Sequence, residues 1–570
     1  MNLHVKAVRE LSHQYVLLSC LILCSSVTLA GETLYNGIVL PDQWPPDVRT
    51  LDKEPIPVPY LDDPPAVIPI DVGRQLFVDD FLVESTTCQR SYHQPTWHPA
   101  SPVLTPDPPD GGWAIPFSDG VWYDPQDGWY KTWYYANGGT KTRYAQSRDG
   151  IHWEKPELDI IPGTNIVMEH PLDTRGLSKR DSATVWLDHT AASPSERFKM
   201  MTMKCDSLCN DHKIYFSEDG IHWSEPQATA GVTHDRSTFF RNPFRDVWVM
   251  SLKSRYREDG KPDARFRRYS EGKTLIAAAE SWPHFSGTEW DDGQTQWWSV
   301  AAGRNMAMTP TMWVDTDRLD PPEAELYNLD AAAYESLMVG FLTIMRQPKD
   351  FPDRGKINTV SLGFSRDGFH WHRPVRDPFL NVSSDVNAWN FLNVQPVGGG
   401  FLVKGDQLHM YASGRNESSG TNVASTGLAL LRRDGFASMD AGEEACMLTT
   451  RPVRFQGKHL FVNLRAPDGK LLVEVLDDQG EVIEPFSRQR CLAVSGDGTR
   501  VAVEWKGNGG QAASLDSLAG TPVRFRFVLQ NGELFSFWVS PDRSGASHGY
   551  VAAGGPDFDG LTDTVGAGRE

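Results

Sequence analysis

Short runs in which apolar and polar residues alternate, separated by Gly, Pro, Asp and Asn, extend along most of the chain. An alternation of period two predicts β-strands with one buried face, and the separating residues are typical of tight turns. Between about residues 120 and 440 these runs return with aromatic residues at their centres, as at 120–123, 183–187 and 247–251. The pattern predicts an all-β protein.

One turn phrase occurs three times. Residues 147–153, 217–223 and 365–371 each follow a strand-like run and share the pattern Ser-x-Asp-Gly-x-His-Trp. Asp-Gly favours a tight turn, and a Trp that returns after it marks a repeated structural unit. The copies start 70 and 148 residues apart, so one copy has decayed between the second and the third. A period of this length with several strands per unit predicts propeller blades.

These patterns divide the chain into parts. Residues 31–74 are Pro-rich and irregular, which predicts a lead-in along the surface. Residues 75–440 contain five units of roughly 60 to 70 residues, which predicts a five-bladed β-propeller, with the strand at 75–83 closing the ring. Residues 441–570 contain alternating strands separated by Asp-Gly and Asn-Gly turns, which predicts a C-terminal β-sandwich.

Length and charge limit the function. A chain of 570 residues is too long for one core and should form at least two domains. The formal net charge of -19 argues against nucleic acid or an anionic membrane surface as a partner held by bulk electrostatics. A locally basic pocket for an acidic substrate is compatible with that charge.

The N-terminus resembles a secretory signal sequence, because two basic residues precede an apolar run that ends in small residues at Ala30. We expect cleavage after Ala30 and export to the periplasm or the outside. No second apolar run is long enough to span a membrane. A lipid anchor on Cys20 is an alternative that the short apolar stretch ahead of it disfavours.

Five cysteines remain beyond this segment. Cys205 and Cys209 flank a short loop that a disulfide would close, which export permits, and free buried thiols are the alternative. No group of residues has the spacing of a zinc site. We therefore predict neither a metal nor a cofactor.

Five blades followed by a β-sandwich resemble the secreted furanosidase clan, glycoside hydrolase families 32, 43 and 68, and most closely family 32 in domain order. The resemblance lies in architecture, since the family 32 signatures around the nucleophile and the acid are absent as written. It implies a glycosidase acting on an oligo- or polysaccharide. The turn phrase also resembles the Asp box of sialidases, which lies far from their catalytic centre, so we interpret all three copies as structural.

Glycoside cleavage requires carboxyl groups that converge in the channel of such a fold. Arg180 and Asp181 open the second unit and are similar to the Arg-Asp pair of family 32, which implies that Asp181 stabilises the transition state. A strand-entry Asp that accepts backbone hydrogen bonds is the alternative. Asp119 lies just before the first strand of the first unit, where the clan keeps its nucleophile or base, and a turn residue is the alternative.

Glu335 lies in a strongly apolar run, so burial should raise its pKa as a general acid requires. Asp235, from the third unit, is the alternative acid, with Arg236 as a ligand for a substrate anion. Aromatic and amide side chains suit the faces and hydroxyls of sugars. The remaining substrate-binding candidates, beside Arg180 and Arg236, are Trp113, Tyr327, Trp389 and Asn393.

These residues predict an exported glycoside hydrolase acting on a plant, algal or microbial glycan. A propeller that binds carbohydrate without cleaving it is one rival, because it would keep the aromatic surfaces without converging acids. A sialidase-like enzyme is a second rival. It would use Arg180, Arg236 and Arg241 to hold a carboxylate and would need a Tyr nucleophile beside them.

Overall fold

The computed structural model describes residues 31–170, 179–205, 210–230, 235–256, 264–282, 310–347, 356–416, 423–507 and 511–564. At positions 179, 181, 204, 205, 210, 211, 255, 256 and 264 it describes the backbone alone. The described chain is nearly all β. Its helices are short: α1 (Pro59–Asp62), α2 (Leu275–Ala279) and the 3₁₀ turns η1 (Pro108–Asp110), η2 (Phe117–Asp119), η3 (Asn137–Gly139), η4 (Pro194–Glu196) and η9 (Leu515–Leu518).

Three antiparallel sheets follow one another along the chain, each built from consecutive strands. The first sheet has β6 (Val121–Asp124), β7 (Trp129–Ala136), β8 (Lys141–Ser147), β9 (Trp153–Glu154) and β10 (Ile166–Glu169). The second has β11 (Lys179–Leu187), β12 (Phe198–Cys205), β13 (Asn210–Ser217) and β14 (Ala228–Ala230). The third has β15 (Thr238–Asn242), β16 (Val247–Tyr256), β17 (Ala264–Gly272) and β18 (Thr311–Val314).

The fourth sheet has nine strands. Its strands in chain order are β5 (Thr96–Trp97), β19 (Glu325–Glu335), β20 (Leu337–Arg346), β21 (Ile357–Ser365), β22 (Asn393–Pro396), β23 (Leu402–Lys404), β24 (Gln407–Asn416), β25 (Val423–Arg432) and β33 (Tyr550–Val551). A single parallel pairing, Asn358 with Asn393, joins β19–β21 to β22–β25. The sheet is therefore two antiparallel sets that meet at one point.

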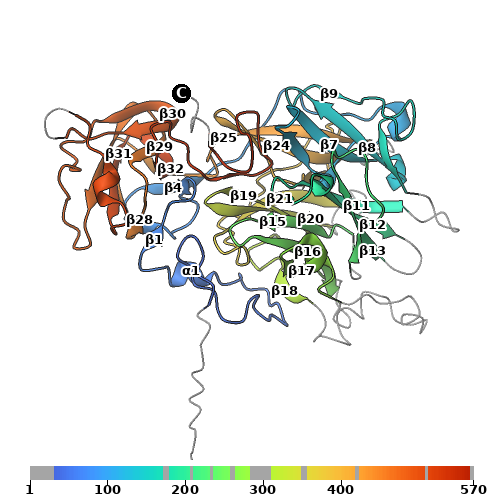
Figure 1. Cartoon of the computed structure of the whole chain (residues 1–570), viewed down its shortest axis with the longest axis horizontal. Helices are drawn as coiled ribbons and strands as arrows, with labels where there is room; N and C mark the ends of the chain where they lie inside the picture. Colours follow the sequence, from blue (N-terminus) through green and yellow to red (C-terminus); the bar gives the residue numbers. More distant parts are fainter. Residues whose placement is uncertain are drawn as a thin grey trace, which may run out of the picture.

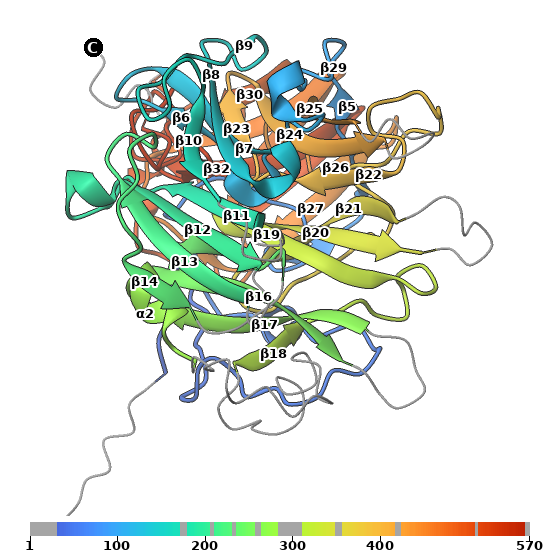
Figure 2. The same cartoon turned by 90° about the vertical axis from the view of Figure 1, so that its right-hand side faces the viewer.

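The first strands of these sheets lie next to one another around a common centre. Strand β11 contacts β6 and β15, β15 contacts β19, and the turn η2 contacts both β11 and β22. Figure 2 shows the sheets following one another around that centre in sequence order. The indoles of Trp122, Trp186 and Trp248 pack in sequence across three of the sheets, with ring centroids 4.6 and 6.1 Å apart.

The repeated phrase forms the predicted turn in all three copies. In the first copy the Asp149 carboxylate accepts the backbone N–H groups of Ile151 and His152, both at 2.8 Å. The Ser147 hydroxyl accepts the Gly150 N–H at 2.9 Å, and Gly150 has a φ of 79°, which glycine adopts without strain. The other two copies repeat these bonds.

Each turn also binds the sheet before it. The indole of Trp133, on β7, donates to the Gly220 carbonyl of the second copy at 2.5 Å. Trp313, on β18, donates to the carbonyl of Phe369 in the third copy at 2.7 Å. The carbonyl of Gly150 in the first copy accepts from Tyr411 of β24 at 2.6 Å, which ties the end of this region to its beginning. The phrase is thus structural, as predicted, and links neighbouring sheets.

The C-terminal sheet has nine strands and lies beside the other four (Figure 1). Its strands are β2 (Gln75–Leu76), β3 (Val83–Thr86), β4 (Gln89–Tyr92), β26 (Ala437–Ala441), β27 (Cys446–Thr450), β29 (His459–Leu476), β30 (Val494–Val503), β31 (Arg524–Gln530) and β32 (Gly532–Ser540). The long strand β29 pairs with β32 over its first half and with β31 over its second.

Residues 75–92 join this C-terminal sheet, which the sequence patterns did not indicate. Gln75 pairs with Phe537 of β32, whereas we expected the strand at 75–83 to close the ring. The strand that pairs with β25 at that place is β5, through Trp97 and Ala429. A disulfide between Cys88 and Cys446 links the same region to β27. The alternative pairing of Cys205 with Cys209 involves side chains outside the described residues.

The predicted lead-in covers the C-terminal sheet. Leu34, Tyr60 and Ile68 are buried in the same apolar cluster as the inner residues of β29 and β31. Strand β1 (Ile68–Pro69) pairs in parallel with β28 (Val453–Arg454). No helix in the described part of the chain is long and apolar enough to cross a membrane. The signal sequence predicted for residues 1–30 lies outside the described residues.

Candidate active site

Five polar side chains gather where η2 meets the first strands of the second, third and fourth sheets. We call Ser118, Asp119, Arg180, Arg236 and Asp330 the central cluster. All five are at most 3% exposed. Buried polar groups require partners or a function, so their contacts decide what the cluster can do.

Asp119 and Arg180 form a fully buried ion pair. Arg180 donates to one carboxylate oxygen of Asp119 at 2.6 Å and to the hydroxyl of Thr142 at 2.7 Å. The other carboxylate oxygen, Oδ1 of Asp119, is buried and has no hydrogen-bond partner among the described residues. Burial raises the pKa of Asp119 to about 6, although Arg180 and Arg236 both oppose the rise.

The turn that presents Asp119 is held from two sides. The N–H of Phe117 donates to the hydroxyl of Ser413 at 2.8 Å, and the Phe117 carbonyl accepts the N–H of Gly398 at 3.2 Å. Gly120 has a φ of 86°, which lets β6 start directly after Asp119. A Cβ on Gly120 would lie 2.4 Å from the Trp122 indole nitrogen. Asp119 therefore belongs to a turn before the strand, held at a defined position.

Arg236 lies against this turn with its guanidinium unpaired. It is 2% exposed, and Nε, Nη1 and Nη2 have no hydrogen-bond partner among the described residues. The guanidinium carbon lies 4.5 Å from the ring centroid of Phe117. The backbone is fixed by an N–H bond to the Ser182 hydroxyl at 2.9 Å and by Arg267, which donates to the Arg236 carbonyl at 2.7 Å.

Asp330, in the middle of β19, completes the central cluster. One of its oxygens accepts the Ser118 hydroxyl at 3.0 Å and the Asn328 amide at 2.5 Å. Burial raises the pKa of Asp330, and the positive charges of Arg236 and Arg267 oppose the rise. Asp330 in turn raises the pKa of Asp119, which places the two carboxyl groups within electrostatic reach of one another.

A second polar group lies nearer the solvent. Asp235 forms an ion pair with Lys253 and accepts the Tyr327 hydroxyl at 3.1 Å, and its side chain is 25% exposed. The Lys253 ammonium lies 4.4 Å from the centroid of the Tyr327 ring. Burial lowers the pKa of Lys253 to about 8, and Asp235 opposes that shift. Arg267 connects this group to the central cluster, because it donates to the carbonyls of both Tyr327 and Arg236.

The structure thus brings together four of the sequence candidates: Asp119, Arg180, Asp235 and Arg236. Asp181 follows Arg180 on β11, but its side chain lies outside the described residues, so its role stays a prediction. Tyr327 joins the outer group. The sequence patterns named neither Ser118 nor Arg267, and only the contacts of η2 and β17 reveal their positions.

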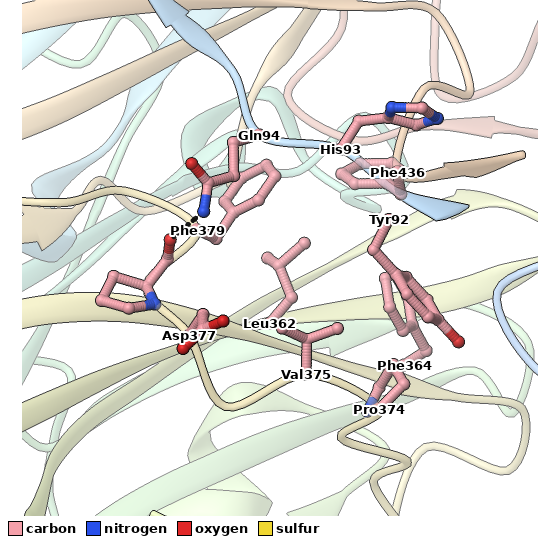
Figure 3. A pocket seen from close by; sticks show the side chains of 11 residues that line it. Tyr92, His93, Gln94, Leu362, Phe364, Pro374, Val375, Asp377, Phe379 and Phe436 are labelled. Carbon is pink, nitrogen blue, oxygen red and sulfur yellow. Dashed lines mark hydrogen bonds between the residues drawn. The ribbon is translucent and has the colours of Figure 1, made fainter. Parts of the chain in front are cut away.

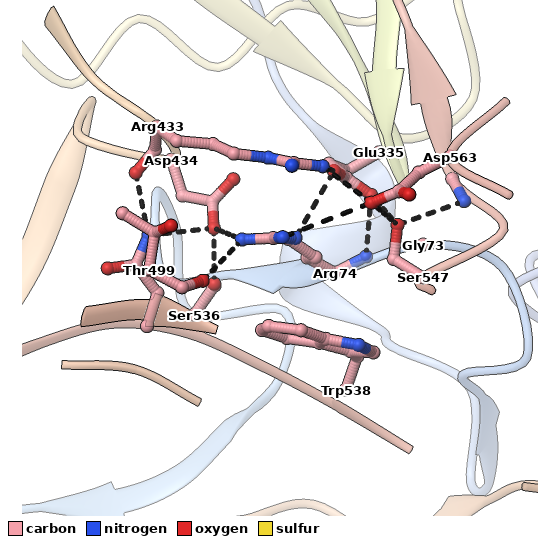
Figure 4. Close-up of polar contacts among 12 residues, drawn as sticks. Gly73, Arg74, Glu335, Arg433, Asp434, Thr499, Ser536, Trp538, Ser547 and Asp563 are labelled. Atoms are coloured by element: carbon pink, nitrogen blue, oxygen red, sulfur yellow. Dashed lines mark hydrogen bonds and ion pairs between the residues drawn. The ribbon is translucent and has the colours of Figure 1, made fainter. Parts of the chain in front are cut away.

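Glu335 occupies a different place. Figure 4 shows it among the guanidinium groups of Arg74 and Arg433 and the hydroxyl of Ser547, with Asp563 beside them. Arg433 donates to one oxygen of Glu335 at 3.0 Å, and the Ser547 hydroxyl donates to the other at 2.6 Å. All of these groups are buried between the fourth sheet and the C-terminal part of the chain. Burial raises the pKa of Glu335, as the sequence predicted.

The ion pairs and hydrogen bonds of this network explain why the Glu335 carboxyl is buried, without a catalytic role. Asp434 accepts from Arg74 at 3.0 Å and from Ser536 at 2.7 Å, and Arg433 donates to Asp563 at 2.6 Å. Glu335 lies five residues beyond Asp330 on the same strand, about 16 Å away at 3.3 Å per residue. The structure does not bring it to the central cluster. Its role as general acid stays a prediction that this position disfavours.

Of the remaining substrate-binding candidates, Trp113 lies near the central cluster, whereas Trp389 packs against other strands. Trp113 packs on Tyr135 at 5.3 Å, and the guanidinium of Arg415 lies 5.1 Å from its ring, next to Phe117 and thus near the central cluster. Trp389 fills the space above Gly414 and Gly427, where a Cβ would lie 2.1 and 2.2 Å from its ring. Trp389 thus packs against two strands, and its role in substrate binding stays a prediction.

Asn393 is buried in β22 and lies beside Gln395, whose amide donates to its Oδ1 at 2.9 Å. Its Nδ2 and the Oε1 of Gln395 have no partner among the described residues. The backbone of Asn393 pairs with Arg415 and Asn358. Asn393 thus has a donor without a partner among the described residues, and its role in substrate binding stays a prediction.

Away from the central cluster, the described part of the chain also forms cavities. Figure 3 shows the first, about 340 Å³ in volume and lined mostly by apolar side chains of β4, β21 and the following loop, among them Tyr92, Leu362, Phe364 and Phe379. The second, of about 400 Å³, is polar and borders the Glu335 network through Arg74 and Arg433. Within the described ranges, no three His, Cys, Asp or Glu residues gather as metal ligands.

No protein-family model and no curated protein matches the chain. Among solved structures, a fructofuranosidase from Schwanniomyces occidentalis in complex with fructose is 13% identical, covering 78% of this chain and 97% of its own, with a TM-score of 0.37. A glycosyl hydrolase from Bacteroides ovatus is 11% identical, over 63% and 97%, with a TM-score of 0.37. A structure from the family 130 of mannoside phosphorylases and glycoside hydrolases is 13% identical, over 61% and 97%, with a TM-score of 0.39.

Proposed function

We propose that the protein is a glycoside hydrolase that cleaves a glycan at the central cluster, with Asp119 as the group that exchanges a proton with the glycosidic oxygen. One observation carries this proposal: the buried carboxyl of Asp119 has a pKa of about 6 and an oxygen without a hydrogen-bond partner in the part of the chain that the structure describes. A carboxyl group with a pKa near the working pH is suited to both giving and taking a proton. Arg180 holds the other oxygen and so aims the free one.

Hydrolysis also requires a second carboxyl group, which acts as nucleophile or as base for water. Asp235 suits that part, since it is ion-paired with Lys253 and partly exposed to solvent. In the proposed reaction Asp119 protonates the leaving oxygen as the bond from the anomeric carbon breaks. The Asp235 carboxylate bonds to that carbon as the leaving group departs. Water then gives a proton to Asp119, and its hydroxyl displaces the Asp235 carboxylate from the anomeric carbon. Asp330 opposes the ionisation of Asp119 and so helps to keep it a proton donor.

The proposal includes the finer architecture predicted from sequence. The first three sheets and the two sets of the fourth would be five blades of a propeller, with the central cluster in its channel. The C-terminal sheet would fold over as a β-sandwich. Its two halves share one apolar core, in which Phe527 of β31 and Phe537 of β32 lie 5.2 Å apart. We also propose that the protein is exported. In the reaction, Asp181 would stabilise the transition state.

The test is sugar release from fructans, arabinans, xylans and sulfated algal glycans by the full chain, with Asp119→Asn alongside. We expect release that the substitution lowers by about 10²- to 10⁴-fold, the usual contribution of one acid–base group. Asp127→Asn, an exposed carboxyl on the same sheet, is the matched control and should keep full activity. No release from any glycan, with glycan binding retained, would replace this proposal by the carbohydrate-binding propeller.

A sialidase-like reaction is a second candidate, and one contact favours it. The Tyr327 hydroxyl donates to Asp235, which is the pairing that a Tyr nucleophile needs for its activation. Arg241 does not join this group, because it pairs with Asp246 and lies 5.2 Å from the Trp248 ring. Release of an acidic sugar that Tyr327→Phe abolishes, while Asp119→Asn leaves it intact, would favour this candidate.

A further inference from the structure

Arg236 differs from the other fully buried arginines of the described chain. Arg74, Arg180 and Arg267 each donate to at least two acceptors through their side chains. The Arg236 guanidinium donates to no described residue, although it is only 2% exposed. A buried cation without partners is costly, so natural proteins keep one where a ligand supplies the partner.

The carboxyl groups near Arg236 are bonded to other partners. The carboxyl groups of Asp119 and Asp330 and the cation of Arg267 interact electrostatically with Arg236, and Asp235 precedes it in the chain. Each carboxyl is already engaged: Asp119 by Arg180, Asp330 by Ser118 and Asn328, and Asp235 by Lys253 and Tyr327. Among the described residues, none of these carboxyl groups accepts a hydrogen bond from the Arg236 guanidinium.

The geometry of Arg236 is prepared for a negative charge. Its backbone is fixed at a φ of 59° by Ser182 and Arg267, and its guanidinium lies on the ring of Phe117. An aromatic face orients a guanidinium plane and leaves the N–H groups at its edges free. Two parallel N–H donors match the two oxygens of a carboxylate or a sulfate group.

We propose that Arg236 binds a single anionic substituent, a carboxylate or a sulfate, on a sugar that occupies the central cluster. That this sugar is a substrate rests on the proposed function, whereas the binding of the anion does not. The substrate class would then be uronic acid or sulfated glycans, in which the anionic group would position the glycosidic oxygen near Asp119. Because the formal net charge of the chain is -19, a local cation such as Arg236 would favour the binding of an anionic ligand.

Binding and catalysis are tested separately. The dissociation constants of methyl glucuronide, glucose 6-sulfate and neutral methyl glucoside are measured by calorimetry on the wild type, Arg236→Gln, Arg236→Lys and Arg241→Gln. We expect one of the two anionic sugars to bind about 10- to 100-fold more tightly than the neutral one, which is the contribution of a charge-assisted pair. The comparison of the two anions tells carboxylate from sulfate.

The variants distinguish a binding residue from a structural one. Arg236→Gln should abolish the preference for the anion, Arg236→Lys should keep part of it, and Arg241→Gln should leave it unchanged. Because the Arg236 side chain has no hydrogen bond to any described residue, the melting temperature of Arg236→Gln should not fall. Equal binding of charged and neutral sugars, no binding of either anion, or a lowered melting temperature with the preference intact would each overturn the inference.

The two proposals fail in different ways. A preference for anions that Arg236→Gln removes, without cleavage of any glycan, would leave the anion site standing and remove the hydrolase. Cleavage of neutral and acidic glycans with the same kcat/KM, lowered equally by Arg236→Gln, would leave the hydrolase standing and remove the anion site.

Discussion

The substitution Asp119→Asn should separate a catalytic carboxyl from a structural ion pair, because the two have opposite effects on stability. Asparagine has nearly the shape of the protonated acid and keeps an oxygen for Arg180, which donates to Asp119 at 2.6 Å. A structural, buried ion pair loses about 3 to 5 kcal/mol when one partner is neutralised. If the fold instead raises the pKa of Asp119, replacing its carboxyl by a neutral amide should increase the free energy of unfolding.

The magnitude follows from the pKa. Burial raises the pKa of Asp119 from 3.8 to about 6. A rise of about two units corresponds to about 3 kcal/mol of preference for the neutral form in the folded state. For a raised pKa this stability is fully present below pH 3.8 and is lost as the pH rises through 6. Asp119→Asn avoids that loss, so above pH 6 it should unfold with a free energy up to about 3 kcal/mol higher than the wild type.

The assay is denaturant unfolding, followed by tryptophan fluorescence, at about pH 4 and about pH 8. At the lower pH the two proteins should have nearly the same free energy of unfolding, and at the higher pH the variant should be more stable and inactive. Asp127→Asn, the exposed control, should show no such pH-dependent difference. A variant that is less stable than the wild type at the higher pH would refute the reasoning and make the Asp119–Arg180 pair structural.

Three further outcomes are expected. Glu335→Gln should keep the activity of the wild type. Because burial raises the pKa of the replaced carboxyl, the free energy of unfolding of the variant should fall less than that of the wild type as the pH rises above 4.5. A folded variant without turnover would instead make Glu335 a catalytic residue. Reducing the disulfide between Cys88 and Cys446 should lower the free energy of unfolding by about 2 to 5 kcal/mol, and no change in the melting curve would contradict this. Gly220→Ala should lower the melting temperature more than Gly163→Ala. Both glycines have a positive φ, but only at Gly220 would the new Cβ lie close to a side chain, 2.4 Å from a carbon of the Trp133 indole. Equal melting temperatures of the two variants would exclude that clash.

The turn phrase was predictable from the sequence because its hydrogen bonds are local. The Asp149 carboxylate accepts N–H groups two and three residues ahead, so the pattern of residue types contains the whole motif. Strand positions were visible for a similar reason, since burial of one face imposes a period of two. Asp119 and Asp235 could be named because each precedes such a strand.

The tertiary structure alone decided which of these groups meet. Asp119 and Arg180 are 61 residues apart, and Cys88 and Cys446 are 358 apart. A raised pKa for Glu335 followed from its apolar neighbours, but its partners come from segments 261 and 98 residues away. The sequence by itself determined the strands, the repeated turns and the burial of the acids. The placement of each acid depended on strand pairing and sheet contacts between distant segments, which a local pattern of residues does not contain.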